Sequence, residues 1–169
     1  MTRPFYIDVI EALNEASVRY TVVGGVATIL HGAPRMTGYL DLAVILQKEN
    51  LLSLIGAMER LGYKPRAPVN PGDLSDPVVR ESWKKDKGMK VFTFFHPMKP
   101  FAEVDILIDE QIDFNGIWER RVEYRAGKVR IPTASIDDLI SMKRGPARDK
   151  DLADITALNR IKAMKEKER

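Results

Sequence analysis

The sequence predicts an α+β fold, in which helices flank one mixed β-sheet and a helical segment follows the sheet. The spacing of apolar residues alternates between helical and strand-like, with a run of strand-like segments in mid-chain and helices at the end. The chain has 169 residues, of which 44% are hydrophobic and 30% charged, so it can bury one substantial core. We expect residues 1–132 to form the α+β core and residues 133–169 to form a helical segment packed on it.

Composition narrows the class of protein. There are no cysteines, which excludes disulfides and thiolate metal sites. No run approaches the roughly 18 apolar residues that a membrane helix needs, and charged residues interrupt the start of the chain, unlike a signal peptide. We therefore expect a soluble, cytoplasmic protein without membrane contact. The net charge of +3 is mild, and the lysine-rich tail is either a solvated helix end or a contact for a polyanion.

In the first half, helices and strands alternate. Phe5, Val9, Ile10 and Leu13 share one helical face, and Gly62 follows a longer apolar helical pattern as a helix end requires. The predicted elements are a helix over residues 4–16, a strand over 20–23, a helix over 26–30, a strand over 40–46 and a helix over 48–61.

The second half begins with a Pro- and Gly-rich loop and then turns to strands. Asp76 is suited to cap one helix and Ser135 another, and a hairpin is expected to turn at Ala126-Gly127 and end at Pro132-Thr133. The predicted elements are a loop over 64–76, a helix over 77–85, antiparallel strands over 90–95 and 101–108, a helical turn over 117–120, the hairpin over 122–131, a helix over 135–143, a break at 144–147 and a last helix from about 149.

The stretch Tyr20 to Leu46 carries the strongest chemical signal. The pair Gly24-Gly25 lies between a strand and a helix, where backbone N–H groups can approach an anion closely. Asp41 lies within an otherwise apolar strand, and a buried carboxylate without a partner is costly. This combination indicates a phosphate and metal site.

A second acid lies in the strand at residues 101–108. Positions two apart on a strand point to the same face, so Asp41 shares a face with Tyr39, and Asp105 shares one with Glu103. If the two strands are neighbours, Asp41 and Asp105 converge on one divalent cation, for which Mg²⁺ is the natural choice with oxygen ligands. The alternative is that each aspartate lies at a strand end or pairs with a lysine or arginine.

The string GGVATILHGAPRMTGYLDLAV resembles nucleotidyltransferases of the DNA polymerase beta superfamily, and in particular the small toxin-type branch related to AbiEii proteins. The resemblance covers about residues 20–158, and Asp105 fits the family's third acidic strand. The residues that match the family's two motifs are Gly24, Gly25, His31, Gly32, Arg35, Thr37 and Asp41 in the first and Lys143, Arg148, Lys150, Asp151 and Asp154 in the second.

The resemblance implies a nucleotidyltransferase-type mixed sheet and Mg²⁺-dependent transfer of a nucleoside monophosphate from a nucleoside triphosphate to an acceptor. The acceptor would be RNA or protein, and an antitoxin partner would accompany a toxin of this type. Asp41 and Asp105 would be the catalytic and metal-binding residues. The nucleotide-binding residues would be Gly24, Gly25, Arg35, Thr37 and Lys143.

Tyr39 departs from the family pattern, because the first acid of an Asp-x-Asp pair would stand there. A phenol is neutral at pH 7 and is a poor ligand for Mg²⁺. The departure favours weak binding of a second metal, unless Glu103 compensates or the tyrosine is an engineered substitution. One rival function is therefore a catalytically degenerate homologue that binds nucleotide or a partner. Another is a basic nucleic-acid-binding accessory protein, supported only by charge.

Several motif residues also admit structural interpretations. Arg35 would either clamp a phosphate or pair with one of the two strand acids. Lys143 would either face the triphosphate or be solvated, and His31 is expected to hydrogen-bond turn backbone instead of acting in catalysis. Asp151 and Asp154 would also suit a salt-bridged helix start.

Overall fold

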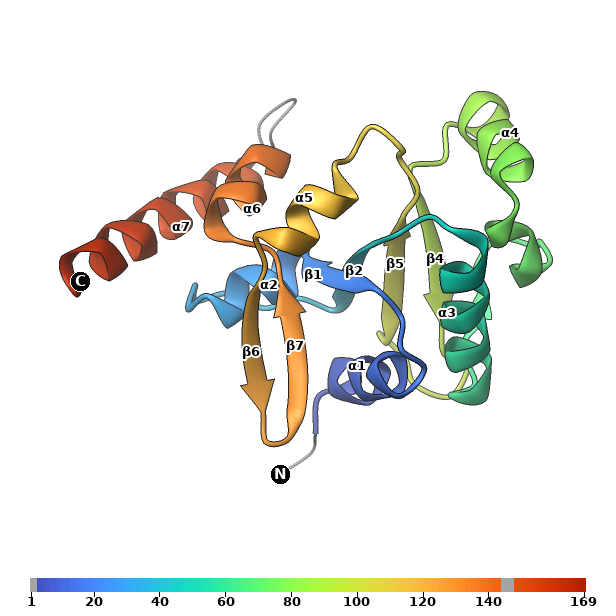
Figure 1. Cartoon of the computed structure of the whole chain (residues 1–169), viewed down its shortest axis with the longest axis horizontal. Helices are drawn as coiled ribbons and strands as arrows, with labels where there is room; N and C mark the ends of the chain where they lie inside the picture. The colour runs from blue at the N-terminus through green and yellow to red at the C-terminus, as the bar shows by residue number, and fades with distance from the viewer. Residues whose placement is uncertain (1–2, 144–147) are drawn as a thin grey trace.

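The computed structural model describes residues 3–143 and 148–169 (Figure 1). The strands are β1 (Tyr20–Val23), β2 (Tyr39–Val44), β3 (Lys64–Pro65), β4 (Val91–Phe95), β5 (Glu103–Leu107), β6 (Val122–Ala126) and β7 (Val129–Thr133). The helices are α1 (Phe5–Glu15), α2 (Gly24–Leu30), α3 (Lys48–Arg60), the 3₁₀ helix η1 (Pro71–Ser75), α4 (Pro77–Lys87), α5 (Phe114–Glu119), α6 (Ile136–Lys143) and α7 (Asp149–Lys167).

In these residues, the strands form one seven-stranded sheet in the order β3-β4-β5-β2-β1-β7-β6. β1 runs antiparallel to β2, whereas β2 is parallel to β5 and β1 is parallel to β7. The sheet is therefore mixed and carries helices, which confirms the predicted fold class. The predicted antiparallel pairing of residues 90–95 with 101–108 is also confirmed, as β4 with β5.

The strands β2 and β5 have one apolar face and one face that carries the acids. Leu40 and Leu42 of β2 lie opposite Val104 and Ile106 of β5, and all four are fully buried. The alternate residues, which carry the acids, face the other side of the sheet. Because a shift of register by one residue would expose these leucines and bury the acids, the apolar core itself fixes how β2 and β5 align.

The helices of the N-terminal half cover the core and end where the sequence indicates. α1 and α3 pack against each other (Figure 1), and Leu54 of α3 is fully buried. Gly62 adopts a left-handed backbone just beyond α3, with φ of 88°. Asp76 caps α4 by accepting a hydrogen bond from the Val78 N–H at 2.9 Å, as predicted.

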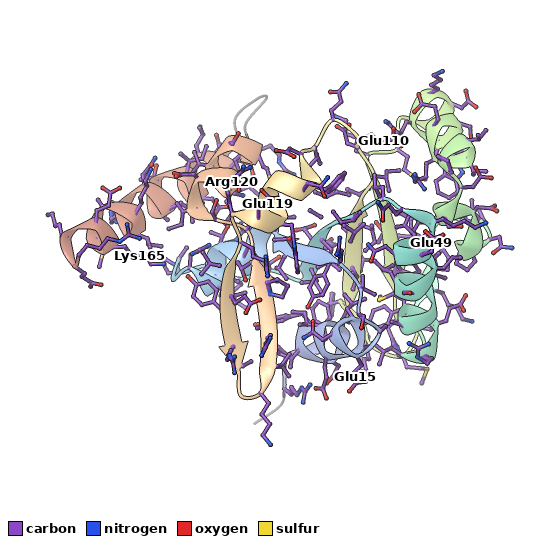
Figure 2. The ribbon with its side chains drawn as sticks, in the orientation of Figure 1. Glu15, Glu49, Glu110, Glu119, Arg120 and Lys165 are labelled. Atoms are coloured by element: carbon purple, nitrogen blue, oxygen red, sulfur yellow. The ribbon has the colours of Figure 1, made fainter. Side chains whose placement is uncertain are left out.

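The C-terminal helix α7 packs on α6 and extends away from β4 and β5 (Figure 1). Ser135 begins α6 by accepting a hydrogen bond from the Asp138 N–H at 3.1 Å. Lys165, marked on α7 in Figure 2, donates a hydrogen bond to the Tyr124 hydroxyl of β6 at 3.1 Å. The break expected at residues 144–147 lies outside the described residues.

Three local predictions are wrong. α2 begins at Gly24 and not at residue 26. Gly24 has a left-handed backbone, with φ of 64°, so the chain turns from β1 into α2 at this one residue. The expected loop at 64–76 contains β3 and η1, since pairing with β4 overrides the local proline signal. The hairpin predicted over residues 122–131 continues through Pro132 and ends at Thr133, which lies in β7 and pairs with Val22.

Among the helices of residues 3–143 and 148–169, none combines the length and apolar character that crossing a bilayer requires.

We predict that Leu54→Ala lowers the free energy of unfolding by about 2–5 kcal/mol, because it leaves a cavity in the core. Leu52→Ala is the matched control on the same helix, since Leu52 is 45% exposed, and it should cost less than about 1 kcal/mol. Urea unfolding followed by circular dichroism measures both. Equal losses in the two variants would contradict the placement of α3.

Candidate functional site

Two carboxylates from adjacent strands meet at the centre of the sheet. β2 and β5 are neighbours, and Asp41 lies directly opposite Asp105 in their parallel register. Burial, with repulsion from Asp105 as a second cause, raises the pKa of Asp41 to about 6. Burial likewise raises the pKa of Asp105, and a hydrogen bond from Thr93 opposes that rise. Two half-buried acids that repel each other favour a cation between them.

The glycine pair lets the backbone of α2 approach Asp41. A Cβ atom on Gly24 would overlap the Asp41 carboxylate and lie only 3.0 Å from its Cβ, and one on Gly25 would lie 3.0 Å from the Thr37 hydroxyl. The Gly25 N–H also donates a hydrogen bond to Asp41. Close packing on Asp41 and a left-handed backbone therefore both favour glycine at position 24, and close packing on Thr37 favours it at position 25.

Thr93 orients the second acid. Its hydroxyl donates a hydrogen bond to Asp105 Oδ1 at 2.6 Å across the antiparallel pair of β4 and β5. Asp105 also has a hydrogen bond with Asp41, so both neighbours fix the orientation of its carboxyl group. Thr93 was not predicted as a site residue, because its place opposite Asp105 depends on the register of the two strands, which the sequence does not define.

Asp154 of α7 forms ion pairs with two basic side chains beside the two acids. Arg35 forms an ion pair with Asp154, and the Lys143 ammonium lies 2.9 Å from Asp154 Oδ2. Asp154 is only 6% exposed, so both cations offset the cost of its burial. Arg35 therefore does not pair with either strand acid, and Lys143 is not a solvated lysine.

A single pocket of about 390 Å³ connects these groups. Every site residue predicted from the sequence lines it, and Tyr39 does too. The predicted residues are Gly24, Gly25, Arg35, Thr37, Asp41, Asp105 and Lys143. Three residues of the second motif that were not among the predicted site residues also line the pocket, namely Arg148, Lys150 and Asp151.

His31 lies outside this pocket and has structural partners. Its Nε2 lies 2.8 Å from the Ala134 carbonyl oxygen, and its Nδ1 lies 2.8 Å from the Tyr124 hydroxyl. Burial lowers its pKa. The histidine therefore hydrogen-bonds backbone, as expected, but that backbone belongs to a distant segment that follows β7.

Tyr39, which stands where the family pattern has the first acid of an Asp-x-Asp pair, has an exposed aromatic ring. Tyr39 is 51% exposed and lies opposite Glu103 in the register of β2 and β5. The Glu103 carboxylate forms an ion pair with Arg66. In the described part of the chain, no three His, Cys, Asp or Glu side chains gather closely enough to hold a metal ion.

The donor set nevertheless fits one hard cation. Asp41 and Asp105 offer carboxylate oxygens from facing positions, and Mg²⁺ commonly takes one or two carboxylates and completes its shell with water and phosphate. The cavity beside them is lined by Arg35, Lys143 and Lys150, which suits the phosphates of such a ligand. These residues would hold Mg²⁺ with a bound polyphosphate.

A sheet of this topology, with paired acids next to a glycine turn and a cation cluster, defines a nucleotidyltransferase-type protein. The chain belongs to the family described as "Nucleotidyltransferase of unknown function (DUF6036)", whose model matches residues 7–165. A search of curated proteins found no match.

Two solved structures share the fold. One is the lincosamide antibiotic adenylyltransferase LnuA in a lincomycin-bound crystal structure, with a TM-score of 0.63 and 16% identity over 95% of this chain and 98% of that one. The other is a solution structure of the antibiotic-resistance factor ANT(2'')-Ia, with a TM-score of 0.55 and 13% identity over 89% of this chain and 78% of that one. Identities this low establish a common fold and nothing about substrates.

We predict that Gly24→Ala destabilises the protein more than Gly88→Ala does. Both glycines are left-handed, with φ of 64° and 61°, so each alanine costs about 1–2 kcal/mol of backbone strain. Nothing lies within 4 Å of a Cβ on Gly88, whereas the one on Gly24 must displace Asp41, at a further cost of about 1–3 kcal/mol. Urea unfolding gives both values, and equal losses would contradict the close packing of Gly24 on Asp41.

Proposed function

We propose that the protein transfers a nucleoside monophosphate from a nucleoside triphosphate to an acceptor hydroxyl, with Mg²⁺ and with release of pyrophosphate. The observation that carries the proposal is the register of β2 and β5, which sets Asp41 opposite Asp105 beside the glycine turn. Family membership supports nucleotidyl transfer in general.

Each pocket residue has a role that its surroundings suit. Asp41 and Asp105 bind Mg²⁺, which when bound offsets charge on the phosphates and aligns them for in-line displacement. Gly24 and Gly25 keep the backbone close to the phosphates, while Thr37 adds a hydroxyl. Lys143 and Arg35, held in place by Asp154, bind the phosphates that leave as pyrophosphate.

A narrower version of the proposal follows from the resemblance to AbiEii-related proteins. In that version the acceptor is RNA or protein, and an antitoxin controls a cytoplasmic toxin. A second version takes a small-molecule acceptor, since one solved neighbour is a lincosamide antibiotic adenylyltransferase and the other an antibiotic-resistance factor, although the shared fold alone does not decide between the versions. The general reaction is common to both versions, and it is the reaction that we propose first.

Tyr39 supports a second candidate, a degenerate homologue that binds nucleotide or a partner without efficient catalysis. The phenol supplies no charge to the cation site, and Glu103 across the register is engaged with Arg66. With two carboxylates instead of three, one cation is held well and a second poorly. The two candidates differ in rate and not in nucleotide binding.

The test follows pyrophosphate release with each nucleoside triphosphate and Mg²⁺, with water taking the nucleoside monophosphate in place of the acceptor hydroxyl, for the wild type, Tyr39→Asp and Tyr39→Phe. We expect Tyr39→Asp to raise the rate by about tenfold or more by completing the carboxylate set, and Tyr39→Phe to give no gain. Activity only in Tyr39→Asp would establish the degenerate homologue. Equal rates in the wild type and Tyr39→Asp would contradict the metal-site assignment.

Nucleotide binding is measured separately by calorimetry on the same proteins. Its absence in both the wild type and Tyr39→Asp would remove nucleotidyl transfer as the function. The accessory-protein rival predicts RNA or DNA binding that weakens steeply with salt, and binding without that dependence would count against it.

A further inference from the structure

Three large apolar side chains are exposed on the segments that lead into β2 and β5, and one of them, Tyr39, lines the pocket. Met36 is 93% exposed, Tyr39 51% and Phe101 87%. Met36 lies between Arg35 and Thr37, both of which line the pocket together with Tyr39. We call Met36, Tyr39 and Phe101 the apolar lip.

The lip comes from two segments that lie side by side. Tyr39 begins β2 and pairs with Glu103 at the start of β5, two residues after Phe101. The carbonyl oxygen of Phe101 lies 3.7 Å from the position of a Cβ on Gly38. The lead-in to β2, which carries Met36, and the lead-in to β5, which carries Phe101, therefore border the same edge of the sheet beside the two acids.

Phe101 has a backbone conformation that is strained for a residue with a large side chain. Its φ is 71°, in the left-handed region where a bulky residue is strained and glycine is not. With 87% of the residue exposed, core packing does not offset this strain. An exposed aromatic ring held on a strained backbone beside a site is the kind of feature that binding a ligand explains.

The geometry of the reaction indicates from which side of the site the acceptor enters. In-line displacement at the α-phosphorus requires the acceptor hydroxyl to enter opposite the leaving pyrophosphate. Lys143 and Lys150, two of the cations that line the pocket, come from the end of α6 and the start of α7, which lie on the β1 and β7 side of β2 (Figure 1). Phe101 comes from the β5 side, so β2 and its Asp41 lie between the cations and this part of the lip. The lip therefore borders the entry path of the acceptor.

We propose that the apolar lip is an acceptor subsite, and that the acceptor is a small hydroxyl-bearing molecule with an apolar or aromatic face. This inference rests on the proposed function. The apolar face packs on Phe101, Tyr39 and Met36 while a hydroxyl reaches the acids. A small molecule fits better than a protein because the lip is only three side chains beside a pocket of about 390 Å³, whereas a stable protein interface takes about 20–30 residues from each partner.

The test uses matched probes that share their hydroxyls and differ only in the apolar group: phenyl β-glucoside and methyl β-glucoside. They are titrated, in the presence of Mg²⁺ and ATP, into protein labelled with ¹³C at the methionine methyl groups. We expect the phenyl probe to shift the Met36 methyl resonance with a Kd about fivefold or more below that of the methyl probe. The methyl of Met164, which is 58% exposed on α7, should not shift.

Phe101→Gly separates a binding role from a structural one. Glycine relieves the left-handed strain and little buried surface is lost, so Tm should not fall, whereas the Kd of the phenyl probe should rise by about fivefold or more. Met164→Ala is the control for loss of an exposed apolar side chain and should leave the Kd unchanged. Equal binding of the two probes, or phenyl binding unaffected by Phe101→Gly, would overturn the subsite.

Failure of the subsite and failure of the proposed function give different results. Mg²⁺-ATP binding with no preference for the phenyl probe overturns the subsite and leaves nucleotidyl transfer in place. Binding of the phenyl probe without any binding of nucleoside triphosphates refutes nucleotidyl transfer, and with it the acceptor role of the lip.

Discussion

Repulsion between Asp41 and Asp105 is the constraint on which the site depends. The two carboxylates face each other across β2 and β5, and neither has moved to a compensating arginine or lysine. Their positions are imposed by the leucines, valine and isoleucine on the reverse face of the same strands, which are fully buried in register. Core packing therefore holds two carboxyl groups together, and either a proton shared between them or a bound cation relieves the repulsion.

The surroundings of the acids are arranged to keep that geometry. Thr93 holds Asp105 from the neighbouring strand, and Gly25 donates to Asp41. On the far side, Asp154 binds Lys143 and Arg35 and so connects α7 to the pocket. The helical segment at the end of the chain is thus part of the site, because it fixes the cations that a polyphosphate would contact.

Residue patterns predicted most of the fold and the membership of the pocket, but not all of its contacts. Alternation along β2 and β5 placed Asp41 and Asp105 on their faces, because the strand period is a local property. The ion pair of Arg35 with Asp154 spans 119 positions and depends on how α7 packs, so no local pattern encodes it. Thr93 was missed for the same reason, since its role depends on register. The proline at position 132 placed the end of the last hairpin strand two residues too early, because the pairing of β7 with β6 continues to Thr133.

The most direct test is a titration with Mn²⁺ as a spectroscopic substitute for Mg²⁺, followed by electron paramagnetic resonance. The account predicts about one tightly bound ion per chain, with affinity lowered about tenfold or more by Asp41→Asn and by Asp105→Asn. Asp151→Asn, which changes another carboxylate of the same pocket, should have a much smaller effect. Tight Mn²⁺ binding that survives both Asp41→Asn and Asp105→Asn would contradict the assignment of these two acids as the cation site.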